Sequence, residues 1–405
     1  MADERVMGTA VFIVLIILAI AYVYINRAGQ GSSATTSMQT GSTNTVITNN
    51  SGTKIVVYNN QSSTNSTSNT VAKNATTTMS PINYVPILIR NNAGTTLPAG
   101  FQEMLVVGSK NYSGQISSSW NNVEFTTVPQ GGGEHVFAWV ESNASSSSNA
   151  TIVWVKLPYA ITPHNSITIY MNFMPFAVMS KYGPTGEAPE LGRNYGAYDN
   201  GGEVFNFYDN FSGTKLDTNL WINSSQFASN PIIVRNGLTI GESASKQNNG
   251  YSAVLSLRSF STGVVDFYGI LHNNSTQPHY QDVGLVPASS NNACNLIDVG
   301  SFVGPGYGGL QVINSYCTAT YAHGLKFGSP QTYSIMVPSL NPNNVTAMVN
   351  YSDPISLSFS AITLPQNIGF ENQGNGGNLG PIYWIRQRDY PYGGTMPQAS
   401  FGRMQ

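Results

Sequence analysis

One uncharged apolar run near the N-terminus constrains this chain more than any other feature. Residues 6–25 read VMGTAVFIVLIILAIAYVYI, and charged residues stand on both sides of the run. Twenty residues in a helix rise about 30 Å, which matches the hydrocarbon thickness of a bilayer. We therefore expect residues 1–27 to form an N-terminal transmembrane signal anchor that contacts the lipid bilayer through residues 6–25.

Two alternatives to an uncleaved anchor stay open. In the first alternative, a pilin-like segment is cut near Gly8 and its helix packs in a filament core. A cleavable signal peptide is not one of them, because it would have a shorter apolar core and a small-residue cleavage site, and no Ala-x-Ala follows Tyr24. In the second, the run is a buried helix of a soluble protein, but its length and the lack of a polar face argue against this. Tyr22 and Tyr24 favour the anchor, because aromatic rings gather at membrane interfaces.

Residues 28–80 consist largely of Gly, Ser, Thr, Asn and Gln, and only Lys54 and Lys73 are charged. Such a segment buries too little apolar area to offset its ordering entropy, so we predict a flexible stalk. Only residues 55–58 (IVVY) are expected to form a short strand. The stalk places the C-terminal body on the extracellular side of the cell membrane, as part of a single-pass protein.

Asn-x-Ser/Thr sequons occur in the stalk and in the body, as they do in glycosylated surface proteins. Sequons also begin at Asn210 and Asn273, but these two are not among the positions that we predict to be N-glycosylated. The predicted positions are Asn49, Asn60, Asn65, Asn74, Asn111, Asn143, Asn149, Asn223, Asn274, Asn344 and Asn350.

The low charge of the chain limits the classes of partner that we expect it to bind. Charged residues make up 9% of the sequence, against about 25% in ordinary soluble domains. The net charge is −2, so nothing attracts nucleic acid. Because carboxylates are few, we expect stability to depend little on pH. We expect no cofactor.

The part from residue 81 onward is predicted to be all-β. Short runs rich in β-branched and aromatic residues are bounded by Gly, Asn, Pro and Ser. No window after residue 25 keeps a 3.6-residue apolar period, so almost no helix is expected. The predicted organisation is a β-sandwich over 81–180, a connecting loop or long ordered insertion over 181–202, and a jelly-roll β-sandwich over 203–405.

Several of these strands resemble a known family in their order. The segments are VEFT (123–126), WVE (139–141), TIVWVKLP (151–158) and ITIY (167–170). They are similar to the DIRF, W-x-E, A-x-V-W-V-K-V-P and I-x-x-Y-Y-G strands of domain-of-unknown-function family 2341, a β-sandwich module of prokaryotic surface proteins. The chain departs from that pattern at residues 171–173 (MNF).

The resemblance continues into the second half. Residues 204–211 (VFNFYDNF), 216–221 (LDTNLW) and 383–388 (YWIRQR) look like the opening and close of a concanavalin A-like, LamG-like jelly roll that follows the module in archaeal-type members. The resemblance implies two β-sandwich domains at a cell surface. It implies no activity, because the family has none assigned.

Side-chain alternation gives a finer prediction for two of these strands. Residues 151–156 are apolar on both faces, which is typical of a central strand. In residues 382–388, Ile382, Trp384, Arg386 and Arg388 share one face, and this predicts guanidinium groups stacked on rings at the sheet surface. Because jelly rolls pair their first and last strands, residues 382–388 should pair near residues 204–211.

We find no catalytic pattern. A family-16 glycoside hydrolase would carry Glu-x-Asp-x-Glu, which is absent, so we predict that the chain is not an enzyme and keep hydrolysis as a less favoured alternative. The acids of the second domain are isolated in sequence and are expected to cap turns. They are Asp209, Asp217, Glu242, Asp266, Asp282, Asp298, Asp353, Glu371 and Asp389. His272, His279 and Asp282 are read as a polar hairpin loop rather than a metal site.

Without a catalytic pattern, a role in binding or assembly remains as the predicted function. We predict a structural, adhesive or interaction protein whose partners are surface glycans or other surface proteins, with a lectin-like glycan-binding module as the alternative. Concanavalin-like sandwiches commonly bind glycans through aromatic stacking, and several tyrosines lie among Asn, Gln and Gly. Tyr251 and Tyr321 share this setting with the four that we predict as glycan contacts, which are Tyr268, Tyr280, Tyr307 and Tyr316.

Cys294 and Cys317 are the only cysteines. Outside the cell a disulfide is the natural interpretation, with two separately buried thiols as the alternative. Strands at 296–299 and 311–313 would bring the two cysteines together across a hairpin, whose turn would lie at residues 304–309.

Overall fold

The fold was analysed in a computed structural model. It describes residues 45–48, 54–57, 82–176, 185–223, 231–241, 254–272, 279–288, 294–302, 308–374 and 378–405. By its contacts the chain divides into two compact units, residues 1–77 and 78–405. Within the described ranges, no helix is long and apolar enough to cross a membrane. The predicted anchor at residues 6–25 lies outside those ranges and stays a prediction.

The first unit contributes one described hairpin. Strands β1 (Thr45–Thr48) and β2 (Lys54–Val57) pair in antiparallel fashion, with Thr45 opposite Val57. β2 covers most of the strand expected at 55–58, whereas β1 was not predicted. The remainder of the predicted stalk lies outside the described residues.

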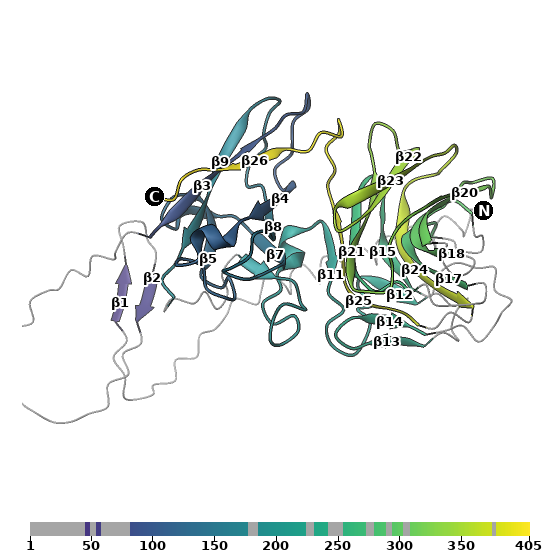
Figure 1. Ribbon diagram of the computed structural model, residues 1–405, viewed down its shortest axis with the longest axis horizontal. Coiled ribbons are helices and arrows are strands. Elements are labelled where there is room, and N and C mark those ends of the chain that lie inside the picture. Colours follow the sequence, from purple (N-terminus) through teal and green to yellow (C-terminus); the bar gives the residue numbers. More distant parts are fainter. Residues whose placement is uncertain are drawn as a thin grey trace, which may run out of the picture. The chain divides into compact units, whose positions relative to one another are not determined.

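The second unit contains two β-sandwiches. The first has a four-stranded and a five-stranded sheet, and the short 3₁₀ helix η1 (Ser109–Tyr112) follows β4. The four-stranded sheet has the order β10 (Thr185–Glu187), β7 (Ala138–Ser142), β8 (Thr151–Lys156) and β4 (Gln102–Val107). The five-stranded sheet has the order β26 (Gln398–Phe401), β3 (Tyr84–Arg90), β9 (Ser166–Phe173), β5 (Val123–Val128) and β6 (Gly132–His135) (Figure 1).

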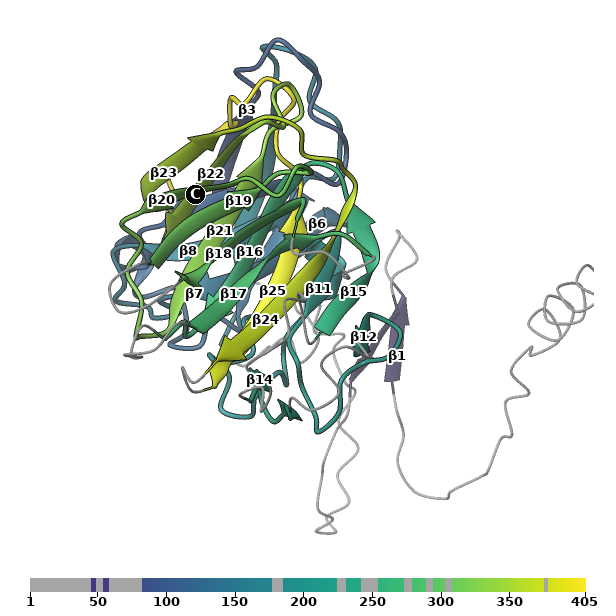
Figure 2. The same cartoon turned by 90° about the vertical axis from the view of Figure 1, so that its right-hand side faces the viewer.

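The second sandwich packs an eight-stranded sheet on a seven-stranded sheet (Figure 2). The eight strands run β13 (Ile232–Val234), β14 (Leu238–Ile240), β25 (Leu379–Arg388), β16 (Gly263–Gly269), β21 (Gln331–Val337), β22 (Asn344–Val349) and β23 (Ser352–Ser358), with β11 (Phe207–Asp209) also on β25. The seven run β12 (Trp221–Asn223), β15 (Val254–Phe260), β24 (Gln366–Gly374), β17 (His279–Val286), β18 (Leu296–Phe302), β19 (Gly308–Ile313) and β20 (Ala319–His323). The four-residue helix α2 (Gly201–Val204) precedes β11.

The strand pairings differ from the predicted limits of the domains. β10 lies inside the predicted loop 181–202, yet it pairs in parallel with β7 of the first sandwich. β26 lies inside the predicted jelly roll 203–405, yet it pairs with β3, again in the first sandwich. Residues 398–401 therefore complete the first sandwich, and the chain crosses between the two sandwiches twice.

The alternation predicted within single strands is largely present. Val153 and Val155 of β8 point into the core of the first sandwich, while Trp154 points the other way. β25 pairs with β11, and Phe207 lies opposite Gln387. Ile382 does not share the face of Trp384. It packs in the sandwich core, because the register with β16 shifts at Gly269.

Aromatic rings join the two sandwiches around one buried arginine. Trp139 and Trp154 of the first sandwich pack with Phe205 and Trp384. The Arg386 guanidinium carbon lies 4.5 Å from the Trp154 ring centroid and 4.7 Å from that of Trp384. The predicted stacking is thus present, but it lies in the interior and not at the sheet surface. Its apolar and cation–π contacts hold the sandwiches together.

Candidate functional site

A pocket of about 880 Å³ opens on the first sandwich. Its walls come from the segment after η1, from β7 and the residues before it, and from residues 185–203. The lining residues are Ser118, Ser119, Trp120, Asn121, His135, Phe137, Val140, Ala144, Thr185, Gly186, Glu187, Leu191, Gly192, Arg193, Ala197, Tyr198, Asp199, Asn200 and Glu203.

Residues 185–203 are fixed in place by hydrogen bonds. β10 lies on β7, and the Ala188 amide extends this contact by donating to the Val140 carbonyl at 2.8 Å. Asp199 accepts bonds from the Trp139 indole at 2.8 Å and from the Tyr208 hydroxyl at 2.6 Å. Burial raises the pKa of Asp199, and these donors oppose that rise. This wall of the pocket is therefore preformed.

Two buried polar atoms of the lining have no hydrogen-bond partner among the described residues. They are the indole Nε1 of Trp120 and the hydroxyl Oγ1 of Thr185. Trp120 is 2% exposed and has φ of +59°, a left-handed conformation that is costly for a bulky residue. Unpaired buried polar groups cost free energy. Both atoms are closed to solvent, and Trp120 packs in the core of the first sandwich, so neither atom offers a hydrogen bond to a ligand in the open pocket.

The remaining side chains of the pocket mix acceptors, donors and rings. Glu187 is half-buried, and burial together with the nearby Asp199 carboxylate raises its pKa. Arg193 adds a guanidinium donor. Phe137 is 40% exposed and Tyr198 is 57% exposed, so two aromatic surfaces face solvent at the pocket. The arrangement suits a small ligand that carries both hydroxyl groups and apolar faces.

The tyrosines predicted as glycan contacts do not form one site in the described structure. Tyr268 is half-buried at the junction of the sandwiches, where it stacks on Trp384 with centroids 5.9 Å apart. Tyr316 is 78% exposed and follows β19, on the other sheet. Tyr307 and the Tyr280 side chain lie outside the described residues. The residues that line the pocket form no sequence motif, so the sequence did not predict it.

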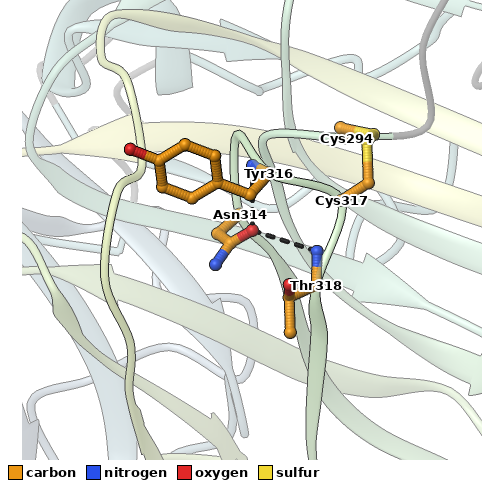
Figure 3. The surroundings of a disulfide bond; sticks show 5 residues. All are labelled: Cys294, Asn314, Tyr316, Cys317 and Thr318. Carbon is orange, nitrogen blue, oxygen red and sulfur yellow. Dashed lines mark hydrogen bonds between the residues drawn. A yellow bond between two sulfur atoms is a disulfide. The ribbon is translucent and has the colours of Figure 1, made fainter.

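The two cysteines are joined by a disulfide, with their Cα atoms 4.7 Å apart (Figure 3). β18 and β19 form the hairpin between them, with Leu296 opposite Ile313. The Asn314 side-chain oxygen accepts bonds from the amides of Tyr316 and Thr318, each at 3.0 Å, and so closes the loop that carries Cys317 (Figure 3). Most of the turn predicted at 304–309 lies outside the described residues.

The described sequons are accessible. Asn111, Asn143, Asn149, Asn223 and Asn350 are exposed, and Asn344 is half-buried. Asn49, Asn60, Asn65, Asn74 and Asn274 lie outside the described residues.

The acids of the second sandwich only partly follow the prediction. Asp209 and Asp217 cap turns by accepting bonds from the Phe211 and Asn219 amides. Asp266, Asp282, Asp298 and Glu371 instead lie within strands and are buried. Sequence spacing could not show this, because their proximity comes from strand pairing. No group of three His, Cys, Asp or Glu side chains in the described ranges is arranged to hold a metal.

Comparisons with known proteins give matches to parts of the chain. No family model matches it, so membership of family 2341 stays a prediction. A stretch of 132 residues, 32% of this chain, is 37% identical to "Uncharacterized protein 562" of Sulfolobus islandicus rod-shaped virus 1. That stretch spans 22% of the length of the viral protein.

Among solved structures, two glycan-cleaving enzymes match part of the chain. The Bacillus licheniformis β-glucanase is 12% identical with a TM-score of 0.34, over 45% of this chain and 97% of the enzyme. An endo-β-galactosidase from Clostridium perfringens is 12% identical with a TM-score of 0.35, over 45% of this chain and 62% of the enzyme. Over the described residues, the chain is nearly all β and forms two joined sandwiches.

Proposed function

We propose that this chain is a membrane-anchored cell-surface protein whose body binds glycans without catalysis, through the pocket of the first sandwich. The exposed rings of Phe137 and Tyr198, which line the pocket together with Glu187 and Arg193, carry the proposal. A sugar offers C–H faces to the two rings and hydroxyl groups to the carboxylate and the guanidinium. Adhesion or structural assembly follows from the same activity when many copies on one surface bind together.

A glycan array probed with the purified full-length protein tests this proposal. We expect dissociation constants between the millimolar and micromolar range, typical of a single small contact surface. Tyr198→Ala and Arg193→Ala should each weaken binding about tenfold, since a stacking or charge-assisted contact is worth roughly 1–1.5 kcal/mol. Tyr392→Ala is the matched control, because Tyr392 is similarly exposed at 56% and is not a lining residue of the pocket.

Binding that survives both pocket substitutions would rule the pocket out. The bound glycans should also be recovered intact. Release of new reducing ends, abolished by a single Asp or Glu substitution, would replace the binding role with hydrolysis.

The surface location is a separate proposal that rests on the apolar run at residues 6–25 and the stalk that follows. Protease added to intact cells should remove the body from the membrane. Full-length protein that persists while other surface proteins are digested would contradict an extracellular body.

A further inference from the structure

Three acidic side chains meet on one face of the seven-stranded sheet. Asp282 of β17 lies directly opposite Glu371 of β24. On the other side of β17, Asp298 of β18 pairs with Gly284 and so lies diagonal to Asp282. Opposite positions bring Cβ atoms to about 4.5–5.5 Å, and diagonal positions to about 7–8 Å. We call these three side chains the carboxyl cluster. Figure 2 shows β24, β17 and β18 side by side.

The carboxyl cluster points away from the main core of the second sandwich. Val283 and Ile297, the chain neighbours of Asp282 and Asp298, pack in that core, so the two acids face the other way. The cluster is nevertheless inaccessible: Asp282 is 1% exposed, Asp298 0% and Glu371 6%. Beside it, Leu255, Val286 and Leu296 form a small apolar group on the same face. The carboxyls thus lie in a setting from which water is largely removed.

Asp298 gives a second, independent observation. Neither of its carboxyl oxygens has a hydrogen-bond partner among the described residues. The charges that act on it are the carboxylates of Asp282 and Glu371, and burial and these charges together raise its pKa well above the ordinary range. Burial and the Asp282 charge raise the pKa of Glu371 in the same direction. An ionised Asp298 would therefore face two further negative charges in a medium of low dielectric.

Asp266 provides a contrast within the same sandwich. It is equally buried, but it accepts bonds from Arg386 at 2.9 Å and from Arg388 at 2.7 Å. Burial alone would raise the pKa of Asp266, but the two guanidiniums lower it to about 2. Asp266 is an ionised, paired carboxylate, whereas the carboxyl cluster consists of acids facing acids.

The described side chains around the carboxyl cluster add few other ionisable groups. On the same face, β15 presents Leu255 and β19 presents Gln311. β20 contributes Tyr321 and His323, of which His323 is exposed and lies opposite Gly309. By register, Gly300 and Gly309 separate Asp282 from His323. Among the described residues, the charges that act on Asp298 are therefore those of Asp282 and Glu371.

We propose that the carboxyl cluster is a proton-binding site: the folded sandwich holds protons on Asp298 and Glu371, beside Asp282, at pH values where the unfolded chain has released them, so acid stabilises this sheet. The sign follows from linkage. The folded state binds more protons than the unfolded state, so stability is greatest below the ordinary carboxyl pKa and is lost as the pH rises toward the folded-state values. For each proton held in this way, the folding equilibrium constant falls tenfold for every unit by which the pH rises over that interval.

Thermal unfolding of the full chain between pH 4 and pH 8 tests this proposal. In the wild type the midpoint should fall as the pH rises. Asp298→Asn replaces a protonated acid with an uncharged amide of the same shape, so the decrease should be shallower and the variant more stable than the wild type at pH 8. Glu371→Gln should act in the same way. Asp353→Asn is the control, since Asp353 is exposed in the same sandwich and its backbone φ of +50° suits Asn.

A direct readout accompanies the unfolding curves. Infrared spectra at pH 7 should show a protonated carboxylic-acid band that weakens in Asp298→Asn and Glu371→Gln and persists in Asp353→Asn. Two results would overturn the proposal. One is a pH dependence that Asp298→Asn and Glu371→Gln leave unchanged. The other is stabilisation of the wild type at pH 7 by Ca²⁺ or Mg²⁺ that both variants lose, because the cluster would then hold a cation instead of protons.

Discussion

At the residue scale, Arg386 shows how this chain tolerates a charge in its interior. The side chain is 0% exposed, and its guanidinium donates to Glu141 at 2.8 Å and to Asp266 at 2.9 Å. Burial opposes the charged form, but Tyr351, Glu141 and Asp266 outweigh it and raise the arginine pKa. Cation–π contacts with the aromatic rings at the junction of the sandwiches offset part of the hydration free energy that the guanidinium loses on burial.

Arg386→Met should lower the free energy of unfolding by about 3–5 kcal/mol, because it leaves Glu141 buried without its counter-charge. Arg403→Met, at an exposed position, should change it by less than about 0.5 kcal/mol. Denaturant unfolding measures both values. A loss below about 1 kcal/mol for Arg386→Met would mean that the rings alone hold the junction together.

At the scale of elements, the sequence predicted strands better than their partners. The sequence predicted β8 because the side chains alternate, with valines on one face and Trp154 on the other. It did not predict the positions of β10 and β26 in the fold, because both strands are short and tertiary packing sets their partners, β7 and β3. The pocket escaped prediction for the same reason. Trp120 and Thr185 are 65 positions apart in the sequence, and both line the pocket only when β10 is paired with β7.

The hairpin of β18 and β19 allows a test of the disulfide. Cys294 and Cys317 are 23 positions apart, a separation for which loop-closure entropy predicts about 3 kcal/mol of stabilisation. The Cys294→Ala/Cys317→Ala double variant should lose about this much free energy of unfolding. A reducing agent should destabilise the wild type equally and leave the double variant unchanged. Two alkylatable thiols in freshly isolated native protein would show that no bridge forms.

At the scale of the whole molecule, the buried carboxylates argue against the expected insensitivity of stability to pH. Carboxylates are few, but many of them are buried. Burial raises the pKa of Glu103 to about 8, against the lowering effect of Arg388, and raises that of Glu190 to about 7. Composition counts charges and cannot show where the fold places them.

The stability of the wild type should therefore have an acidic optimum. Glu103 and Glu190 each contribute stability that is fully present below their ordinary pKa of 4.5. This contribution is lost as the pH rises through about 8 for Glu103 and through about 7 for Glu190. Asp266 acts in the opposite sense, with a contribution that is present above 3.8 and lost as the pH falls through about 2. Calorimetric midpoints should peak near pH 4. A peak near pH 8 would contradict this assignment.

The tryptophan indole N–H signals in nitrogen-15 NMR give the sharpest test for glycan binding in the pocket of the first sandwich. The chain has five tryptophans, and four of their indoles already donate to Asp199, Glu141, Asp209 or Glu190. Trp120 alone has an indole without a described partner. Titration with a glycan selected on the array should shift the signals of Trp120, which lines the pocket, and of Trp139, whose indole donates to the lining residue Asp199. The signals of Trp154, Trp221 and Trp384 should stay near their starting positions. Trp120 and Trp139 signals that both stay fixed while the glycan binds would show that it does not bind in this pocket.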